Sequence, residues 1–474
     1  MEKFYITTPI YYINDKPHIG SAYTTIAADV LARYYRNKGV DTFFLAGTAE
    51  HGSKIATSAE KAGKDPQSFA DEMSAKFSTA WDVLQITNND FIRTTEKRHA
   101  EAVNKFFLKL KDSGKIYEGE YEGLYCIGHE AFIKESELVN GVCPDHKTKP
   151  EMVKEKNWFF KLSEYGPILK EKILSLELVV APEERKNEIL SFIDQGLEDI
   201  AISRQNAKFA LPLPWDESQT IYVWLDELFN YCTAVGYGTD TEKFNKYWPV
   251  DMHLVGKDII KFHCVIWPAL LLAIGEKVPK KVFAHGFFTI DGQKISKTIG
   301  NVIDPIEWAT KYGPDVVRYF LLREVPFGQD GDISEEKLKL RYSGDLANGL
   351  GNLLSRITTL VEKYSPSLVI GEAQLWKTSD NIDELIENYK FHEALAKMWE
   401  WVAWGNKAVD ENKLWELGKT DVKKFEEIST QILSCLVTTS THLQPFMPEV
   451  SRKILEHLKK EKITKAEPLF PRVQ

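Results

Sequence analysis

The opening of the chain carries the pattern that most restricts its fold. Residues 4–8 form an apolar run typical of a buried strand, residues 20–36 place apolar side chains at helical spacing, and residues 42–45 predict another strand. A strand, a helix and a strand in this order predict a βαβ unit, in which the two strands lie parallel. The chain therefore starts as an α/β domain built on a parallel sheet.

The remaining sequence changes character twice. Beyond about residue 113 it turns to short strand signals, turns and Cys/His pairs, which predict an insertion, and strand signals return at residues 221–224 and 252–255. From about residue 335 onward apolar residues recur every three or four positions, which predicts a separate helix bundle. We therefore expect five segments: the first half of the α/β domain at 1–113, the insertion at 114–219, the second half at 220–290, a loop and linker region at 291–345, and a helical domain at 346–474.

The composition, 43% hydrophobic and 27% charged over 474 residues, indicates a globular protein of several domains. The longest apolar stretch, residues 265–274, is shorter than the roughly 18 residues that a membrane helix needs, so no membrane partner is expected. The N-terminus has no apolar or Arg-rich leader, and the five cysteines do not suit a secreted disulfide framework, so we expect a cytoplasmic location. The net charge of −9 gives no indication of nucleic-acid binding, and the basic run at 457–465 is explained equally well as a solvated tail.

A histidine and a glycine, His18 and Gly20, follow the first predicted strand. The imidazole can donate a hydrogen bond, and the glycine leaves the backbone bare at the positive end of a helix, which suits the phosphates of ATP. Seen alone, such a triplet is explained better by a turn and a helix cap. Its position directly after the first strand of an α/β unit favours nucleotide binding.

A pair of lysines, Lys294 and Lys297, flanks Ser296 in a loop that glycines bound on both sides. Cations that meet the pyrophosphate only in the transition state would lower the barrier for its departure. A lysine-rich surface loop is the alternative explanation when the run is seen alone. We call residues 294–298 the paired-lysine loop.

Together and in this order, the two signatures resemble those of class I aminoacyl-tRNA synthetases. The segments 7–12, 223–226, 256–263 and 300–305 narrow the resemblance to the methionyl-tRNA synthetases, and it runs essentially from end to end. It implies a Rossmann-like parallel-sheet catalytic domain with an inserted zinc-knuckle domain and a C-terminal all-α anticodon-binding bundle. The implied activity is ATP-dependent activation of L-methionine to methionyl-adenylate, followed by transfer to tRNA(Met).

The resemblance also implies roles for individual residues. The expected catalytic residues are His18, Gly20, Ser21, Lys294, Ser296 and Lys297. ATP, with Mg²⁺, is expected to contact His18, Gly20, Gly256, Asp258, Lys294 and Lys297. The methionine side chain is expected to lie among Ile10, Tyr12, Trp224, Glu227, Tyr231, Ile259 and His263. Aromatic walls suit a polarizable thioether, and a polar group near the sulfur helps to reject a plain hydrocarbon. Taken singly, each of these aromatic or apolar residues is more often part of a core.

Three departures from the family pattern are mild. Ser21 stands where the first signature ends in a second histidine, Ile295 replaces a common methionine, and Thr298 replaces a serine. Serine can still donate a hydrogen bond, and both lysines remain.

Two departures bear on methionine itself. Ala49 stands where the family has an aspartate that holds the substrate's ammonium group, and Glu227 stands where it has a small alanine. We hypothesise that Glu227 supplies the carboxylate that is missing at Ala49. The alternatives are that Glu50 turns inward, or that this chain is a poorly active paralogue.

Two Cys-x-x-His pairs, Cys126 with His129 and Cys143 with His146, lie in the predicted insertion. Four such ligands at knuckle spacing predict a tetrahedral, structural Zn²⁺ site without an open position for water. Family members often have cysteine at the place of His129, and others have lost the metal. Turn residues satisfied by hydrogen bonds are the alternative.

The helical domain contains candidate RNA-binding residues. Asn352 and Arg356 are four residues apart and share a helix face, and Trp415 could stack on an unpaired base. In methionyl enzymes such residues look like those that read the CAU anticodon; a helix-packing arginine and a buried tryptophan are the alternative. The chain stops near where these helices should finish, before the dimer-forming domain of some relatives, so we expect a monomer.

Other functions stay open at this point. One is a class I synthetase for another amino acid, such as leucine or cysteine. Another is a catalytically weakened paralogue that acts as an RNA-binding or regulatory module. A third is a nucleotidyltransferase of the same superfamily that acts on a small molecule, which the helical domain disfavours.

Overall fold

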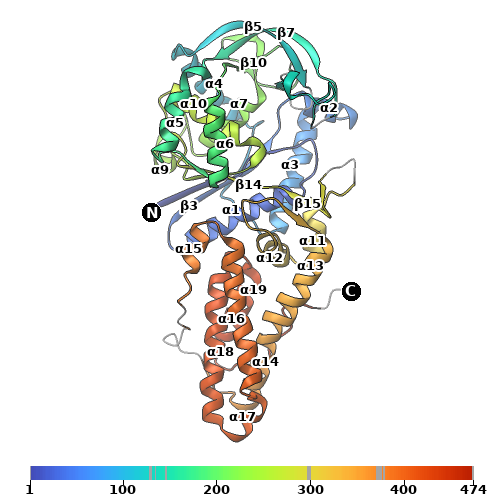
Figure 1. The fold of residues 1–474 in the computed structure, drawn as a ribbon, viewed down its shortest axis with the longest axis vertical. Helices are drawn as coiled ribbons and strands as arrows, with labels where there is room; N and C mark the ends of the chain where they lie inside the picture. The colour runs from blue at the N-terminus through green and yellow to red at the C-terminus, as the bar shows by residue number, and fades with distance from the viewer. Residues whose placement is uncertain are drawn as a thin grey trace.

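A parallel sheet lies at the centre of the N-terminal part of the chain in the computed structural model (Figure 1). The structure describes residues 2–126, 131–133, 135–144, 147–205, 207–295, 300–369, 376 and 379–471. The strand order is β2-β3-β1-β13-β14-β8, with β4 paired to β3, and all the pairings are parallel. The strands are β1 (Lys3–Thr7), β2 (Tyr11–Tyr12), β3 (Asp41–Ala49), β4 (Asp90–Arg93), β8 (Val179–Ala181), β13 (Met252–Gly256) and β14 (Lys281–His285).

The predicted βαβ opening is confirmed. Helix α1 (Ile19–Asn37) connects β1 to β3, which pair in parallel from Lys3 with Asp41 to Thr7 with Leu45. Alternate side chains of β1 enter different cores, because Ile6 packs with α1 and the later helices whereas Tyr5 packs on the opposite face. A sheet buried on both faces needs apolar side chains in both directions, which explains the continuous apolar run in this strand.

Further helices cover the sheet. They are α2 (Ser53–Lys61), α3 (Pro66–Val83), α4 (Lys97–Asp112), α5 (Gly166–Leu174), α6 (Glu183–Asp194), α7 (Val223–Leu228), α8 (Asn230–Thr233), α9 (Thr241–Tyr247) and α10 (Trp267–Ala273). The 3-10 turn η3 (Lys257–Ile259) and the π-helical turn η4 (Phe262–Ile266) precede α10, so the predicted helical run after β13 is present.

An antiparallel sheet of order β6-β5-β7-β9 forms the far end of the molecule, at the top of Figure 1. Its strands are β5 (Ile116–Cys126), β6 (Ala131–Ile133), β7 (Glu151–Phe160) and β9 (Ile200–Ala201). The short strand β8 falls within the stretch predicted to be an insertion, yet it pairs with β14 of the central sheet. The proposed domain boundaries therefore stay a prediction, and one strand of that stretch belongs to the central sheet.

The predicted strand at 221–224 is wrong. The chain forms β12 (Asp216–Ile221), which pairs with β10 (Ser203–Arg204) and β11 (Pro212–Leu213) in a separate antiparallel sheet. Helix α7 then begins at Val223. Val223, Leu225 and Leu228 are buried within this helix, and periodicity alone cannot tell a short buried apolar run in a helix from one in a strand.

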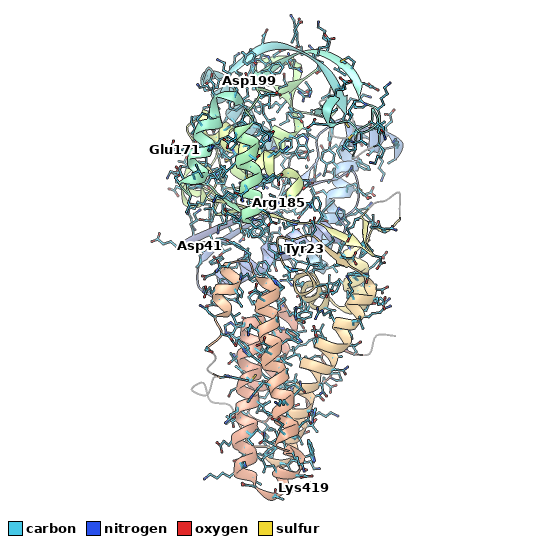
Figure 2. The ribbon with its side chains drawn as sticks, in the orientation of Figure 1. Tyr23, Asp41, Glu171, Arg185, Asp199 and Lys419 are labelled. Carbon is cyan, nitrogen blue, oxygen red and sulfur yellow. The ribbon has the colours of Figure 1, made fainter. Side chains whose placement is uncertain are left out.

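A helical column and bundle follow, as predicted, and extend away from the sheet (Figure 1). The helices are α11 (Pro305–Tyr312), α12 (Pro314–Glu324), α13 (Glu335–Arg341), the π-helical η5 (Tyr342–Gly351), α14 (Asn352–Tyr364), α15 (Ile382–Glu387), α16 (Phe391–Glu411), α17 (Leu414–Thr420), α18 (Val422–Leu443) and α19 (Pro448–Leu458). A small sheet of β15 (Phe288–Ile290), β16 (Gln293–Lys294) and β17 (Gly331–Ile333) lies between the two parts. Figure 2 places Tyr23 near this junction and Lys419 at the distal tip.

One buried ion pair joins the two parts. The guanidinium of Arg318, in α12, lies 2.7 Å from Asp29 in α1, and both side chains are fully buried. Arg318 also donates to the carbonyl oxygens of Pro445 (2.8 Å) and Phe446 (2.9 Å), just before α19. Within the described part of the chain, no helix combines the length and apolar character needed to cross a bilayer.

Candidate active site

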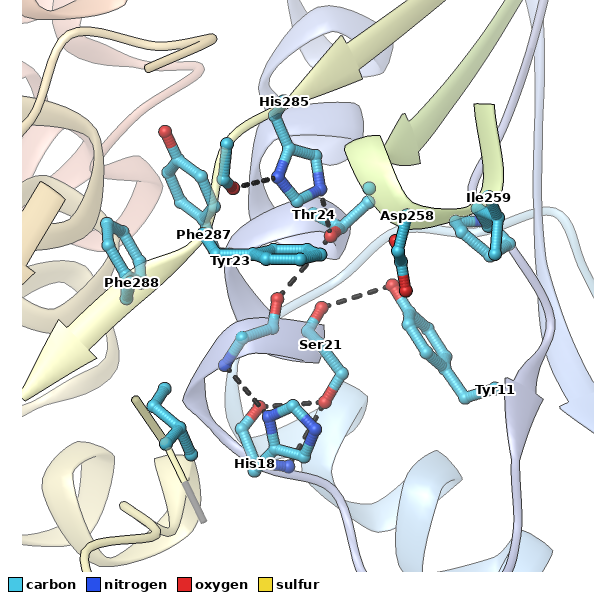
Figure 3. A pocket seen from close by; sticks show the side chains of 15 residues that line it. Tyr11, His18, Ser21, Tyr23, Thr24, Asp258, Ile259, His285, Phe287 and Phe288 are labelled. Atoms are coloured by element: carbon cyan, nitrogen blue, oxygen red, sulfur yellow. Dashed lines mark hydrogen bonds between the residues drawn. The ribbon is translucent and has the colours of Figure 1, made fainter. Parts of the chain in front are cut away.

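A cavity of about 280 Å³ lies at the carboxyl ends of β1, β13 and β14 (Figure 3). Ligands of open parallel sheets bind at this edge, because the loops that follow the strands gather there. The walls include predicted residues from three separate segments of the sequence. They are His18, Gly20, Ser21, Gly256, Asp258 and Ile295.

His18 is the N-cap of α1 and is held by its neighbours. The Gly20 N–H donates to Nδ1 of His18 (3.1 Å), so the ring carries its proton on Nε2 when it is neutral. The Ser21 hydroxyl accepts from the His18 N–H (3.1 Å) and donates to the His18 carbonyl oxygen (2.7 Å). Ser21 therefore completes a capping box, which fixes the imidazole at the cavity wall.

Two glycines let functional side chains fold back into the cavity. A Cβ on Gly20 would lie 3.0 Å from the ring of His18. A Cβ on Gly256 would lie 2.6 Å from Oδ1 of Asp258. A larger residue at either position would displace the imidazole or the carboxylate, so both predicted glycines have a steric reason to be there.

The paired-lysine loop begins at the same cavity. Lys294 pairs through its backbone with Thr289, and the next residue, Ile295, lines the cavity together with His18. Ser296, Lys297 and Thr298 lie outside the described residues, as does the side chain of Lys294. The first signature and the start of the second therefore meet on one cavity.

The segment that follows the loop is fastened to the first signature. The Ile19 N–H donates to the carbonyl oxygen of Ile303 (3.0 Å), and Lys16 pairs with Asp304 at 2.9 Å. Both ends of the loop region are thus close to the start of α1.

Sequence reasoning missed His285, which ends β14 and lines the cavity. Its Nδ1–H donates to the carbonyl oxygen of Gly286 (2.7 Å), so Nε2 accepts from the Thr24 hydroxyl (2.7 Å). Burial lowers the pKa of His285 to about 4, so the imidazole that lines the cavity is uncharged at pH 7. A His-Gly pair at the end of the apolar run 282–284 was the available signal.

The residues predicted to line the methionine cleft form an aromatic cluster that adjoins the cavity through Ile259, which lines the cavity and packs against that cluster. The Tyr231 hydroxyl donates to Nε2 of His263 (2.8 Å), because the other ring nitrogen donates to the Ile259 carbonyl oxygen (3.0 Å). Burial lowers the pKa of His263 to about 4, which keeps the ring neutral. The indole of Trp224 stacks on Phe262 with centroids 4.4 Å apart.

The remaining predicted cleft residues come from the first strands. Ile10 is buried in the same core as Tyr231, and Tyr12 is half-buried against it. Tyr12 pairs with Ala49 across β2 and β3, so the position of the family's missing aspartate lies beside this part of the cleft. The structure thus brings the predicted methionine residues into one region of the fold.

Glu50 does not turn towards this cleft. Its buried carboxylate accepts from Arg93 at 2.7 and 2.9 Å and from the hydroxyls of Thr48 (2.7 Å) and Thr95 (2.5 Å). These donors use both oxygens, so the carboxylate is engaged elsewhere. The alternative that Glu50 replaces the aspartate is therefore not favoured.

Glu227, the carboxylate of the main hypothesis, lies in α7. It is buried in α7, and its charge adds to the effect of burial in raising the pKa of Tyr231 above the ordinary range. The preceding residue, Asp226, accepts from Nδ1 of His51 (2.6 Å), two residues beyond Ala49. This bond holds the start of α7 beside the end of β3.

Asp226 itself was not singled out by the sequence. It is buried and accepts hydrogen bonds from His51 and from Nε2 of His99 (2.8 Å). Although burial opposes ionisation, the two imidazoles hold the pKa of Asp226 well below its usual range. The cluster fastens α7, which carries Trp224 and Glu227, to the sheet and to α4.

Comparisons with known proteins agree with this geometry. The family model described as "tRNA synthetases class I (M)" matches residues 4–150 and 136–358. The chain belongs to this methionyl class I family. A curated methionine–tRNA ligase of Thermotoga maritima is 45% identical, over 96% of this chain and 75% of the relative. One from Rickettsia felis is 43% identical, over 98% of this chain and 93% of the relative.

Solved structures of the methionyl family share the whole fold. The Mycobacterium tuberculosis methionyl-tRNA synthetase in complex with methionyl-adenylate superposes with a TM-score of 0.92 at 36% identity and covers 100% of both chains. The apo form from the same organism gives a TM-score of 0.84 at 32% identity. The Rossmann-like α/β core and the helical C-terminal region are therefore those of a methionyl class I synthetase.

The predicted metal ligands of this methionyl synthetase are only partly described. Cys126, at the end of β5, and Cys143 are both buried. The Lys147 N–H donates to the Cys143 carbonyl oxygen (2.8 Å), and the Cys143 N–H donates to the Thr148 carbonyl oxygen (2.9 Å). His129 and His146 lie outside the described residues, and the described part of the chain holds no group of three or more potential metal ligands.

The predicted anticodon residues of the synthetase lie on neighbouring helices. Asn352 donates to Asn406 (3.2 Å), and Arg356 forms an ion pair with Asp410, so α14 is fastened to α16 by polar contacts. Trp415 is 39% exposed, so it is not the buried tryptophan of the alternative explanation. Arg356, by contrast, has the helix-packing contact that its alternative foresaw.

Proposed function

We propose that this chain is a methionine–tRNA ligase that activates L-methionine with ATP and transfers it to tRNA(Met). The observation that carries the proposal is one cavity lined by His18 and Gly20, by Asp258 and by Ile295 of the paired-lysine loop, next to a cluster of aromatic side chains. The names of the curated relatives and the methionyl-adenylate complex of a similar structure support the choice of substrate.

The nucleotide lies in the cavity under this proposal. The Nε2–H of His18 binds a phosphate oxygen, and the missing side chain at Gly20 lets the phosphates approach the positive end of α1. Asp258 accepts from the ribose hydroxyls, with Gly256 leaving room beside it. Mg²⁺, when bound, neutralises charge on the phosphates.

The chemistry needs no side-chain nucleophile. A carboxylate oxygen of methionine forms a bond to the α-phosphorus of ATP, and the bond to the β-phosphate oxygen breaks, so that pyrophosphate leaves. Lys294, Ser296 and Lys297 stabilise the charge that grows on the leaving pyrophosphate. A ribose hydroxyl at the 3′ end of the tRNA then attacks the methionyl carbonyl carbon, and AMP leaves. Positioning and charge stabilisation carry both steps.

Methionine specificity comes from the aromatic cleft. Ile10, Tyr12, Trp224 and Ile259 provide apolar walls, and the Tyr231–His263 pair provides a polar contact for sulfur. The Tyr231 hydroxyl donates to Nε2 of His263. His263 therefore fixes the orientation of Tyr231. Because burial keeps His263 neutral, the cleft presents no imidazolium that would attract an acidic side chain.

The ammonium group of methionine is held by Glu227. This residue is buried in α7, which the His51–Asp226 bond holds beside the strand that ends at Ala49. With alanine at position 49, a carboxylate from α7 restores the negative charge that a buried ammonium group requires.

A structural Zn²⁺ and the CAU anticodon complete the proposal. The buried thiols of Cys126 and Cys143 are soft ligands that suit zinc, and His129 and His146 would supply the other two. Trp415 offers an exposed ring on which an anticodon base can stack, and Asn352 and Arg356 of α14 are the polar residues proposed to bind the same anticodon. We also propose that the chain acts as a monomer in the cytoplasm.

The direct test is charging of tRNA(Met) transcripts with labelled methionine, with leucine and cysteine as comparators. The proposal expects methionylation that depends on ATP and on the CAU anticodon. Trp415→Ala should lower charging by about 100-fold or more while methionine-dependent pyrophosphate exchange stays within about threefold. Absence of charging by the unaltered protein would favour the weakened paralogue, and equal losses in both assays would remove the anticodon role of Trp415.

A further inference from the structure

The segment 329–333 lies against the nucleotide cavity. A Cβ on the cavity residue Gly286 would come within 2.3 to 2.5 Å of backbone atoms of this segment, so only glycine fits there. Asp330 accepts from the Phe287 N–H (2.7 Å) and pairs with Lys257 at 2.5 Å. Phe287 lines the cavity, and Lys257 lies between the cavity residues Gly256 and Asp258 in the chain. The segment therefore supports the cavity wall from behind.

Two residues further on, Asp332 holds the hairpin that leads into the paired-lysine loop. Its Oδ1 accepts from the Gly292 N–H (2.6 Å) and from the Thr289 hydroxyl (2.8 Å). Its Oδ2 accepts from Lys337 at 2.9 Å. These contacts, the Gly292 N–H first, lower the pKa of Asp332, so the carboxylate is ionised at neutral pH. One carboxylate thus bridges a turn, a strand and helix α13.

The hairpin has little freedom of its own. Strands β15 and β16 pair through Thr289 with Lys294 and Ile290 with Gln293, leaving a two-residue turn. Both turn residues, Asp291 and Gly292, have positive φ angles of 51° and 75°. This is the turn geometry that matches the twist of a tight hairpin. The position of the turn therefore fixes Lys294 and Ile295, where the paired-lysine loop begins.

The lysine that pairs with Asp332, Lys337, belongs to the helical part of the molecule. Lys337 lies in α13, which continues through η5 into α14, the helix that carries Asn352 and Arg356. In Figure 1 this column runs from the small sheet at β15 down the molecule. The hairpin is consequently anchored to the same column that carries proposed RNA-reading residues.

We propose that Asp332 is a positioning residue for the activation step, which holds the hairpin so that the paired-lysine loop meets the triphosphate. This inference rests on the proposed function. Asp332 and Lys337 have side chains 33% and 38% exposed, so the pair contributes little to global stability. Its loss should therefore appear in catalysis and not in folding.

The test is the rate of methionine-dependent ATP–pyrophosphate exchange by variants of the full chain. Asp332→Ala should lower kcat by about tenfold or more, because a misplacement of about 1 Å at a catalytic group has effects of this size. The methionine KM and the thermal midpoint should stay close to those of the unaltered protein. Asp332→Asn keeps an oxygen for the Gly292 N–H and should recover most of the lost kcat. Asp194→Ala removes another half-exposed carboxylate, paired with Lys170 on α5, and is the matched control.

Lys337→Met removes only the contact between Asp332 and helix α13. It should lower kcat by about threefold at unchanged methionine KM. Unchanged kcat in Asp332→Ala would overturn the inference, as would a loss of kcat matched by a lowered thermal midpoint. If Asp332→Ala fails to fold, Lys337→Met decides alone. An unaltered protein without exchange activity would instead count against the proposed function, so the two failures are distinguishable.

Discussion

At the scale of single residues, the exchange of charge between positions 49 and 227 is the most informative departure from the family. Ala49 is fully buried and cannot bind an ammonium group, whereas Glu227 is a buried carboxylate on the adjoining helix. Glu50, the other nearby carboxylate, is occupied by Arg93. Our proposal therefore assigns the ammonium group to Glu227.

Glu227→Gln should raise the methionine KM by about tenfold or more, because a charged hydrogen bond to the ammonium group is lost. The ATP KM should stay within about twofold, since the cavity is unchanged. Glu217→Gln, which alters an exposed carboxylate of β12, serves as the control. An unchanged methionine KM in Glu227→Gln would remove the hypothesis.

Buried neutral histidines predict a pH dependence of stability. Burial lowers the pKa of His263 and of His285 to about 4, and that of His253 well below its ordinary value. Between about pH 6.5 and 4 the unfolded chain thus binds more protons than the folded one. The contribution of these histidines to the free energy of unfolding is fully present above about pH 6.5 and is lost as the pH falls towards 4. Urea midpoints should drop between pH 7.5 and 5.0, less steeply in His285→Gln, and equal midpoints would contradict this.

Residue patterns in the sequence predicted the residues that line the cavity better than the residues that hold its walls in place. His18, Gly20 and Asp258 stand in short runs beside strand ends, where the chemistry of a nucleotide site can be inferred. Asp226, Asp330 and Asp332 act through partners far away in the chain, such as His99 for Asp226. A single sequence gives no signal for such contacts, because only the fold brings the partners together.

At the scale of elements, long periodic segments were predictable and short ones were not. The parallel β1–α1–β3 opening and the C-terminal helices have many apolar positions, so their periods are clear. Strand β8 has three residues and no period to detect, although it extends the central sheet. The run at 221–224 is apolar and short, and its helical character depends on burial against neighbouring helices.

The β5–β7 region makes a separate prediction for the proposed metal. Protein purified without chelator should contain about one equivalent of zinc, because four ligands at knuckle spacing bind tightly. Cys143→Ala should remove most of it, whereas Cys435→Ala, at a buried cysteine of α18, should leave it unchanged. Metal content well below half an equivalent in the unaltered protein would reject the zinc site.

At the scale of the whole molecule, Arg318 joins the catalytic sheet to the helical bundle. Arg318→Met should lower the free energy of unfolding by about 3–5 kcal/mol, because Asp29 loses a buried partner and two carbonyl groups lose their donors. Arg452 forms two exposed ion pairs on α19, and Arg452→Met should lower the free energy of unfolding by less than about 1 kcal/mol. Denaturation curves in urea measure both, and similar midpoints for the two variants would contradict a joining role.

The central claim is that one ATP is bound by the start of α1 and the paired-lysine loop beside a cleft made for methionine. Methionine-dependent ATP–pyrophosphate exchange, run beside leucine and cysteine, tests it most directly. The account predicts exchange with methionine about 100-fold faster than with either comparator, and a loss of about the same size in His18→Ala. No exchange with methionine, or equal exchange with all three amino acids, would contradict it.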